Sequence, residues 1–367
     1  MKVQNFKTVG SGSYQPQDVQ FLLKDLSHIT LEGSLEDREF RIQNKAEHYS
    51  ESLPAEKLPS FQYLECYEKA LTLNGLLTAD LIKKVSVQLY NLFQEEMVLV
   101  SLARAGTPVG ILMKRYLSMY MGKTIPHYSI SIIREKGLDL NALAYIKTKH
   151  KNKKVIFIDG WTGKGSITRE LYKSCELFSK RENESVEPIL AVLSDPAHSA
   201  AISGTNDDIL LPHACLNATV SGLISRTIHN QKWISPDEFH GAKLYKEWSD
   251  SDHSNSYVET ITSLFTPAEI NQGNGLLHPP LFLGAEEVNQ IAHEFHIENI
   301  HLIKPSIGET TRVLLRRLPW GILVKNKKDP QVQHILALAE EKHVEVIEYR
   351  SMSYRSCGII QPMGDAK

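Results

Sequence analysis

The chain has 367 residues, 42% of them hydrophobic and 23% charged, and a formal net charge of −2 at pH 7. This length allows two or more domains with separate cores, and the composition is that of a globular protein. The four cysteines are widely spaced without a CxxC pair, which argues against a disulfide framework or a zinc site. No signal core and no apolar run of the ~18 residues that cross a bilayer is present, so we expect a cytoplasmic protein without a membrane partner.

The first part of the chain is expected to pack on a core as an extension. Residues 1–60 are polar and mixed, apart from a short apolar patch from Val19 to Leu26. From Phe61 to Phe93 apolar residues recur at helical spacing, with an interruption at Asn74-Gly75. This pattern predicts two helices, and we assign residues 1–92 to an N-terminal helical extension.

From Met97 onward, strand-like and helix-like segments alternate. The apolar runs typical of buried strands are Met97 to Leu102, His127 to Ile133, Val155 to Ile158 and Pro188 to Ser194. Helical patterns follow the first three of these runs and start near residues 109, 141 and 167. The alternation predicts an α/β domain over residues 93–270, with a parallel sheet covered by helices on both faces.

A small-residue loop, Thr162-Gly163-Lys164-Gly165-Ser166, joins one of these strands to the helix after it. Free backbone N–H groups and the helix dipole make such a turn a ready anion site. Asp159 closes the strand, where an acid can hold sugar hydroxyls or a metal. Spacing excludes a Walker A loop, because Ile158 stands five residues before Gly163. The loop therefore predicts a phosphate beside a polyol, with a ligand-free turn as the alternative.

A second loop, Ala103-Arg104-Ala105-Gly106-Thr107, follows another strand of the same predicted sheet. Ligands of such sheets bind at the carboxyl ends of the strands, so the two loops can face one ligand. Backbone amides and Arg104 suit a pyrophosphate group.

The C-terminal residues 280–367 have the pattern of a small α/β/α domain, preceded by a boundary at residues 271–280. Between His301 and Lys328 one acid, Glu309, stands among seven basic residues: Lys304, Arg312, Arg316, Arg317, Lys325, Lys327 and Lys328. Such a local cluster fits RNA binding, and a solvated helix face is the alternative.

Several motifs together resemble one known family. SLARAGTP and FIDGWTGKGS resemble the pyrophosphate and ribose-phosphate loops of type I phosphoribosyltransferases. More closely, GSYQPQDVQFLL, HYSESLP, SLARAGTPVGILMKRY, HYSISIIREKG and DGWTGKGSI resemble the phosphoribosyltransferase–PELOTA fusion family of tellurite-resistance and stress operons, also labelled the StiP family of cysteine proteases. The resemblance covers nearly the whole chain. It implies a type I phosphoribosyltransferase-like sheet and a C-terminal PELOTA-like RNA-binding domain.

The resemblance also implies an activity. The enzyme would use phosphoribosyl pyrophosphate and Mg²⁺ to ribosylate an unidentified acceptor, in the synthesis of a nucleoside-like metabolite. Asp159 and Arg104 would be catalytic, and Asp159 would also hold the metal; Gly160 stands where most such enzymes carry a second acid. The implied ligands of the 5-phosphate are Thr162, Gly163, Lys164, Gly165 and Ser166, and those of the pyrophosphate are Ala103, Arg104, Ala105, Gly106, Thr107, Arg134 and Lys136.

The segment IGETTRVLLRR resembles the start of the RNA-reading helix in the PELOTA group. Glu309 and Arg312 match the acid and base of its Asn-Glu-x-x-Lys pattern, whereas Gly308 replaces the asparagine that contacts a base. The RNA-binding residues implied are Glu309, Arg312, Arg316 and Arg317. RNA would then be held through phosphates and shape.

Two other functions remain open. A non-catalytic regulator would sense a nucleotide in the sheet domain and bind RNA through the C-terminal domain. A cysteine protease needs a thiol beside a base, and Cys215, which follows His213 closely, is the candidate. A buried, inert thiol is the alternative interpretation of Cys215.

Overall fold

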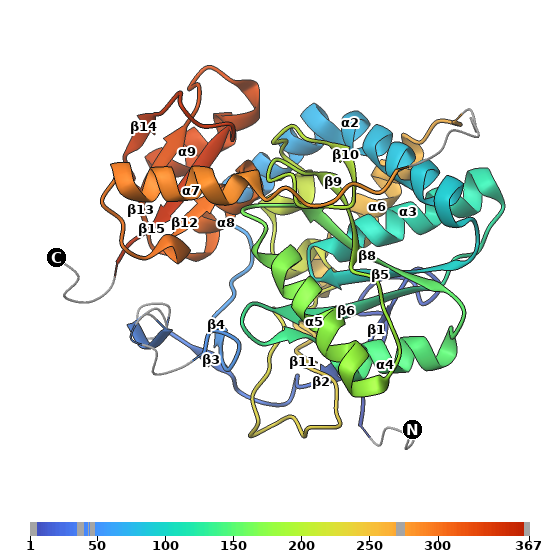
Figure 1. Cartoon of the computed structure of the whole chain (residues 1–367). Helices are drawn as coiled ribbons and strands as arrows, with labels where there is room; N and C mark the ends of the chain where they lie inside the picture. Colours follow the sequence, from blue (N-terminus) through green and yellow to red (C-terminus); the bar gives the residue numbers. More distant parts are fainter. Residues whose placement is uncertain (1–5, 35–39, 43, 45–47, 269–275, 363–367) are drawn as a thin grey trace.

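The computed structural model describes residues 6–34, 40–42, 44, 48–268 and 276–362. A larger domain holds a central sheet with helices on both faces, and a smaller C-terminal domain packs against it (Figure 1). This confirms the predicted α/β architecture with a small C-terminal domain. The expected boundary at residues 271–280 begins outside the described residues.

The central sheet has the strand order β1-β6-β5-β8-β9-β10, and all neighbours along this path are parallel. Its strands are β1 (Gln20–Phe21), β5 (Met97–Ala103), β6 (His127–Ile133), β8 (Lys154–Trp161), β9 (Ile189–Ser194) and β10 (Ile202–Thr205), and the short β7 (Gly137–Leu138) pairs with β6. Successive side chains of β5 enter different apolar clusters, since Met97 and Leu99 belong to one and Val98 and Val100 to the other. Such burial on both faces explains the continuous apolar runs of the sequence.

Helices from different parts of the chain cover the two faces. One face carries α2 (Phe61–Phe93), α3 (Gly106–Met121) and α6 (Ser254–Ser263). The other carries α4 (Leu140–Lys149) and α5 (Ser166–Glu182). The two loops predicted to bind a ligand therefore leave the sheet at the same edge, after β5 and after β8 (Figure 1).

The prediction of two helices between Phe61 and Phe93 is wrong, because this segment is the single helix α2. Asn74 and Gly75, which suggested a break, are buried contact points in its middle. The Asn74 amide donates to the carbonyl of Leu210 at 2.8 Å, and a Cβ at Gly75 would lie 3.3 Å from Leu264. Packing thus overrides the weak helix propensity of these two residues.

Most of the described residues before α2 form short strands and turns. Besides β1 they contribute β2 (Lys24–Asp25), which pairs with β11 (Gly241–Ala242), and β3 (Glu32–Gly33), which pairs with β4 (Leu53–Pro54). This part of the chain thus completes the edge of the larger domain.

The C-terminal domain has a four-stranded sheet in the order β12-β15-β13-β14. The strands are β12 (Ile303–Pro305), β13 (Pro319–Val324), β14 (Val346–Glu348) and β15 (Ser356–Ile360), and the helices are α7 (Leu283–Glu294), α8 (Ile307–Arg316) and α9 (Gln333–Glu341). α7 covers one face with a separate apolar cluster, whereas Ile307, Leu314 and Ile335 join the cluster that contains α2 and α3. The two domains therefore share apolar packing.

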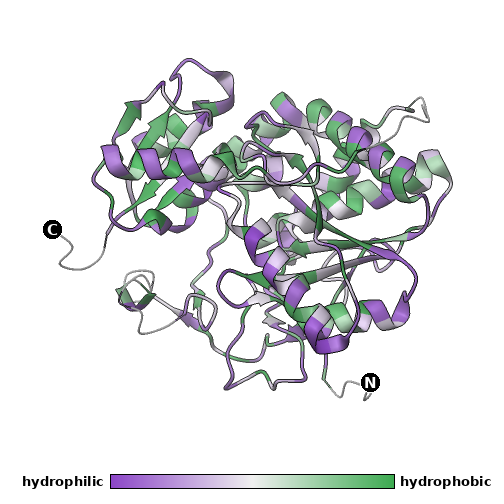
Figure 2. Ribbon diagram, in the orientation of Figure 1, coloured by the Kyte–Doolittle hydropathy of each residue, from purple (hydrophilic) through white to green (hydrophobic). Residues whose placement is uncertain are grey.

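Hydropathy follows this architecture. The strands of both sheets are largely hydrophobic, and hydrophilic residues lie on the outward faces of α5 and α7 (Figure 2). Among the described residues, no helix combines the length and apolar character that a membrane span requires.

Candidate functional site

A cavity of about 330 Å³ lies where the small domain meets the carboxyl edge of the central sheet. The larger domain lines it with the ends of β5, β6 and β8 and the start of α5, and the small domain with β12 and α8. Its volume is at the lower end of the roughly 300–1,000 Å³ usual for small-molecule sites. We call this cavity the cleft. A group of nucleotide size fits such a space.

The cleft is strongly basic. Eight of the described cationic side chains line it, against two carboxyl groups, Asp159 and Glu309. The cations are Arg104, Arg134, Lys164, Arg226, Lys304, Arg312, Arg316 and Arg317. All four predicted RNA-binding residues on or beside α8 are therefore at this site. Lys325, Lys327 and Lys328, from the same basic segment, are exposed and do not line it.

Two cations of the cleft, Lys304 and Arg226, were not among the predicted site residues. Lys304 is the more informative of the two. Its side chain has no hydrogen-bond or ion-pair partner among the described residues. Burial, together with the charges of Arg134 and Lys164, holds the pKa of Lys304 well below its ordinary value. A half-buried ammonium group beside other cations is costly unless an anion compensates it. Lys304 belongs to the basic segment between His301 and Lys328, but its neighbours Arg134 and Lys164 lie far away in the chain, so its place in the cleft could not be predicted locally.

The two carboxyl groups come from opposite domains. Asp159 lies near the end of β8, and Glu309 lies in the first turn of α8, where its carboxylate accepts a hydrogen bond from Arg312 at 2.9 Å. Burial, followed by the negative charge of Glu309, raises the pKa of Asp159 to about 7. Burial also favours the neutral form of Glu309, but the charges of Arg312 and Lys304 outweigh it and lower the pKa of Glu309. The environment thus separates the pKa values of the two groups.

Trp161 forms the floor under Arg312, whose guanidinium lies 4.4 Å from the centre of the ring. The indole is only 8% exposed. A Cβ added at Gly308 would lie 2.3 Å from this ring. The tryptophan therefore explains why glycine replaces asparagine at the start of α8: the ring occupies the space of any larger side chain.

The loop from Thr162 to Ser166 lines the cleft as predicted, but several of its polar groups already have protein partners. The Thr162 hydroxyl donates to Asp195 at 2.6 Å, and the carbonyl of Gly163 accepts from Tyr354 at 2.7 Å. The Lys164 ammonium donates to the carbonyls of Ile300 and Ile303 at 2.5 and 3.2 Å, and burial lowers its pKa to about 8. The loop is thus also the platform on which the small domain docks.

The loop after β5 contributes less than expected. Ala103 and Arg104 line the cleft, whereas Ala105, Gly106, Thr107 and Lys136 do not. The Arg104 guanidinium is clamped by Glu56 at 2.7 Å and by the carbonyl of Ile224 at 2.8 Å. Gly106 begins α3, and a Cβ there would lie 2.2 Å from the carbonyl oxygen of Ile158. Glycine is needed at this position because the start of α3 packs closely against β8, and not because a ligand requires it.

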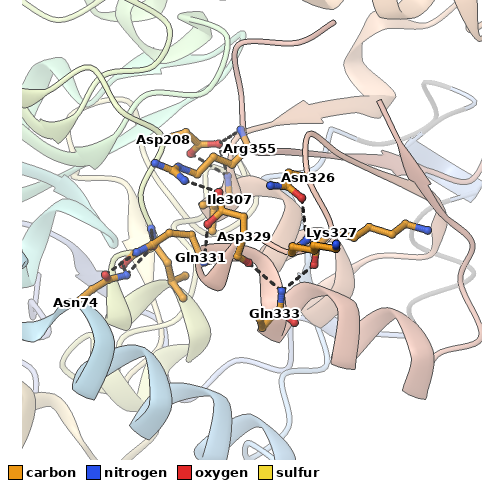
Figure 3. Close-up of polar contacts among 11 residues, drawn as sticks. Asn74, Asp208, Ile307, Asn326, Lys327, Asp329, Gln331, Gln333 and Arg355 are labelled. Atoms are coloured by element: carbon orange, nitrogen blue, oxygen red, sulfur yellow. Dashed lines mark hydrogen bonds and ion pairs between the residues drawn. The ribbon is translucent and has the colours of Figure 1, made fainter. Parts of the chain in front are cut away.

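A second set of polar contacts, made by residues that do not line the cleft, fixes the small domain (Figure 3). The Asp208 carboxylate accepts backbone N–H groups of Ile307 at 3.0 Å and of Arg355 at 3.0 Å. Asn74 and Gln331 exchange two side-chain hydrogen bonds of 2.8 Å. These contacts cross between the domains, so they hold α8 against the edge of the central sheet.

The donors around Asp159 do not fit a magnesium site. Mg²⁺ prefers several oxygen ligands in octahedral geometry. Among the described residues there is no group of three or more His, Cys, Asp and Glu side chains that could hold a metal ion. The carboxyl groups of the cleft are instead surrounded by cationic side chains, which repel a divalent cation.

Comparison with known proteins gives the family. Residues 12–262 match the model described as "Tellurite-like stress resistance cysteine protease StiP", and residues 282–362 match the "PELOTA RNA binding domain". A protein of Acinetobacter baylyi named "Cysteine protease StiP" is 33% identical in an alignment 370 residues long. The alignment covers 96% of this chain and 95% of that protein. The chain belongs to the StiP family. It also carries a PELOTA RNA-binding domain at its C-terminal end.

The expected phosphoribosyltransferase activity is contradicted by these matches. The StiP family model and the full-length relative both have the description of a cysteine protease, and neither is described as a transferase. The StiP and PELOTA parts of the resemblance are confirmed, together with the link to tellurite-like stress. A Gly-rich loop at the end of a parallel strand is common to many α/β proteins, so it suggested a transferase that the family does not support.

The cysteines of this StiP family member are poorly placed for thiol chemistry. Cys215 is 2% exposed, and burial raises its pKa. The Nδ1 atom of the nearby His213 lies 3.1 Å from the Tyr257 hydroxyl. Burial raises the pKa values of Cys175 and Cys357 to about 12, and it also raises that of the half-buried Cys66. The structure thus supports the inert interpretation of Cys215 over the catalytic one.

Thiol accessibility makes a direct prediction. In the native protein, iodoacetamide at pH 8 is expected to alkylate Cys66 and to leave Cys175, Cys215 and Cys357 unmodified, because only Cys66 is partly exposed. Peptide mass spectrometry, with a urea-unfolded sample as the control for complete labelling, measures this. Rapid modification of Cys215 in the native sample would show an activated thiol and contradict the structure.

Proposed function

We propose that this StiP family member is a stress-resistance protein that binds RNA, with RNA phosphates held in the cleft between its two domains. The observation that carries the proposal is Lys304, a half-buried cation placed among cations from both domains. Its ammonium group has no hydrogen-bond or ion-pair partner among the described residues. Phosphate contacts dominate the affinity of proteins for nucleic acids. The match to the PELOTA RNA-binding domain over residues 282–362 supports RNA as the polyanion. We place this activity in the cytoplasm.

The rim of the cleft offers a place for a base. The Tyr49 ring lines the cleft, with the guanidinium groups of Arg134 and Arg226 each 5.6 Å from its centre. Single-stranded RNA binds where aromatic rings stack on bases beside cations that follow the backbone. Gly308 has no side-chain amide that could contact a base. The proposed binding therefore depends on charge and stacking and has little sequence preference.

The central test replaces Lys304 by methionine, which keeps the stem of the side chain and removes the charge. Binding of a fluorescent single-stranded RNA of about 20 nucleotides, measured by anisotropy between 50 and 300 mM salt, is expected to weaken. The slope of log affinity against log salt should fall by about 1 for the lost phosphate contact. Lys328→Met is the matched control, since Lys328 is an exposed lysine of the same domain outside the cleft.

Two outcomes would contradict the proposal. One is an unchanged affinity and salt slope in Lys304→Met. The other is an equal loss in Lys328→Met, which would place the RNA on the exposed β13–α9 connection instead of in the cleft.

Thiol-dependent peptide hydrolysis is the second candidate, favoured by the name of the full-length relative. Hydrolysis of fluorescent casein by wild type, Cys66→Ser and Cys215→Ser tests it. Loss of hydrolysis in one variant would identify the nucleophile, whereas equal rates in all three proteins would exclude both cysteines.

A further inference from the structure

We propose that the cleft also cleaves RNA, by transesterification, with Glu309 as the general base and Asp159 as the general acid. This inference rests on the proposed function, because it requires an RNA strand in the cleft. It adds a chemical reaction, an acid–base pair and a product to the binding role.

The geometry places an acid and a base from different domains in one cavity. Asp159 approaches from the carboxyl end of β8 and Glu309 from the first turn of α8, and both line the cleft. The two domains are electrostatically linked here, since Arg312 and Glu309 of the small domain both influence the pKa of Asp159 in the larger domain. A phosphodiester bound in the cleft would lie in the cavity that both carboxyl groups line.

The protonation states suit opposite roles. With its pKa of about 7, Asp159 is protonated in a large fraction of molecules at neutral pH and can donate a proton. Glu309 is ionised because its pKa is lowered by Arg312 and Lys304 against the effect of burial, so it can accept one. Two carboxyl groups with separated pKa values are a recurrent arrangement for acid–base catalysis.

The reaction is balanced without an external co-reactant. As the ribose O2′ attacks the adjacent phosphorus, its proton passes to the Glu309 carboxylate. The P–O5′ bond breaks, and the leaving O5′ takes the proton of the Asp159 carboxylic acid. The products are a 2′,3′-cyclic phosphate and a free 5′-hydroxyl end, and proton exchange with water restores both carboxyl groups.

The cations of the cleft supply the electrostatic part. Negative charge develops on the non-bridging phosphate oxygens during the attack, and fixed cations in a partly buried site stabilise it strongly. Lys304 and Arg312 are placed for this role, because both line the cleft and both interact electrostatically with Glu309. Arg312 is further oriented by its contact with the Trp161 ring.

The test uses the full chain, a single-stranded RNA with a 5′ fluorophore, and the same strand built from 2′-deoxynucleotides. The RNA is expected to yield fragments with 2′,3′-cyclic phosphate ends, and the DNA is expected to stay intact because it lacks the attacking hydroxyl. Asp159→Asn and Glu309→Gln should each slow cleavage by about 100-fold or more, while Asp159→Asn retains RNA affinity. Asp80→Asn, an exposed carboxylate of α2 that pairs with Lys83, is the control with unchanged cleavage.

The pH profile gives an independent readout. The wild-type rate should decrease above about pH 7, where Asp159 loses the proton that it must donate, and Asp159→Asn should lack this decrease. Binding without cleavage would overturn the inference and leave the proposed function standing. Absence of binding would overturn both. Equal cleavage by wild type and Asp159→Asn would indicate another nuclease and also overturn the inference.

Discussion

Replacing Asp208 by alanine is expected to loosen the PELOTA domain from the larger domain and to lower the free energy of unfolding by about 2–5 kcal/mol. The carboxylate is 5% exposed and accepts the backbone N–H groups of Ile307 and Arg355 across the domain boundary. Alanine would leave both buried donors without an acceptor. It would also remove the carboxyl group at the N-terminus of α8, where the helix dipole favours its ionised form although burial raises its pKa to about 7.

Urea denaturation measures the stability change, and hydrogen exchange of the α8 amides reports the separation of the domains. Asp207→Ala is the matched control: this neighbouring residue is exposed, and its replacement should change stability by less than about 0.5 kcal/mol. If Asp208→Ala unfolds like wild type, with unchanged exchange in α8, the interface does not depend on this carboxylate.

Replacing Gly308 by asparagine is expected to disrupt the floor of the cleft. The new Cβ would lie 2.3 Å from the Trp161 ring, which has Arg312 and His213 as neighbours. We expect a loss of about 2–3 kcal/mol in the free energy of unfolding, as for an overpacked core site. The asparagine typical of RNA-reading helices is therefore incompatible with Trp161 in this protein.

A double-mutant cycle with Trp161→Ala separates this collision from a loss of helix propensity. If the ring is the obstacle, Gly308→Asn should cost at least ~1 kcal/mol less when Trp161 is absent. Thermal or urea unfolding of the two single variants and the double variant provides the comparison. Strictly additive effects would show that the two residues do not compete for the same space.

The central sheet and the two loops after β5 and β8 could be predicted from the sequence, because parallel strands that are buried on both faces have continuous apolar runs. β5, β6, β8 and β9 all fall on predicted strands. The prediction of a helix break at Asn74-Gly75 was wrong, because helix propensity does not report tertiary contacts. Asn74 donates to the carbonyl of Leu210, and Gly75 packs beside Leu264. β15, the strand between β12 and β13, had no clear local pattern and was missed.

The site was predictable only in part, for the same reason. Asp159 and the loop from Thr162 to Ser166 line the cleft, as expected from strand ends that meet at one edge. Docking of the small domain gives Lys164 other partners, because its ammonium group donates to the carbonyls of Ile300 and Ile303. Arg104 is held by Glu56 within the larger domain. Contacts between domains, such as those of Lys304 and Asp208, depend on residues far apart in the chain. No local motif predicts them.

Cross-linking of 4-thiouridine RNA to the full chain, followed by peptide mass spectrometry, tests the central claim most directly. If the cleft holds the RNA, adducts should appear in both domains at its lining, on peptides that contain Tyr49 or Lys164 and on those that contain Lys304 to Arg317. Lys304→Met should reduce both sets. Adducts confined to the exposed segment from Lys325 to Lys328, with none at the cleft, would contradict the account.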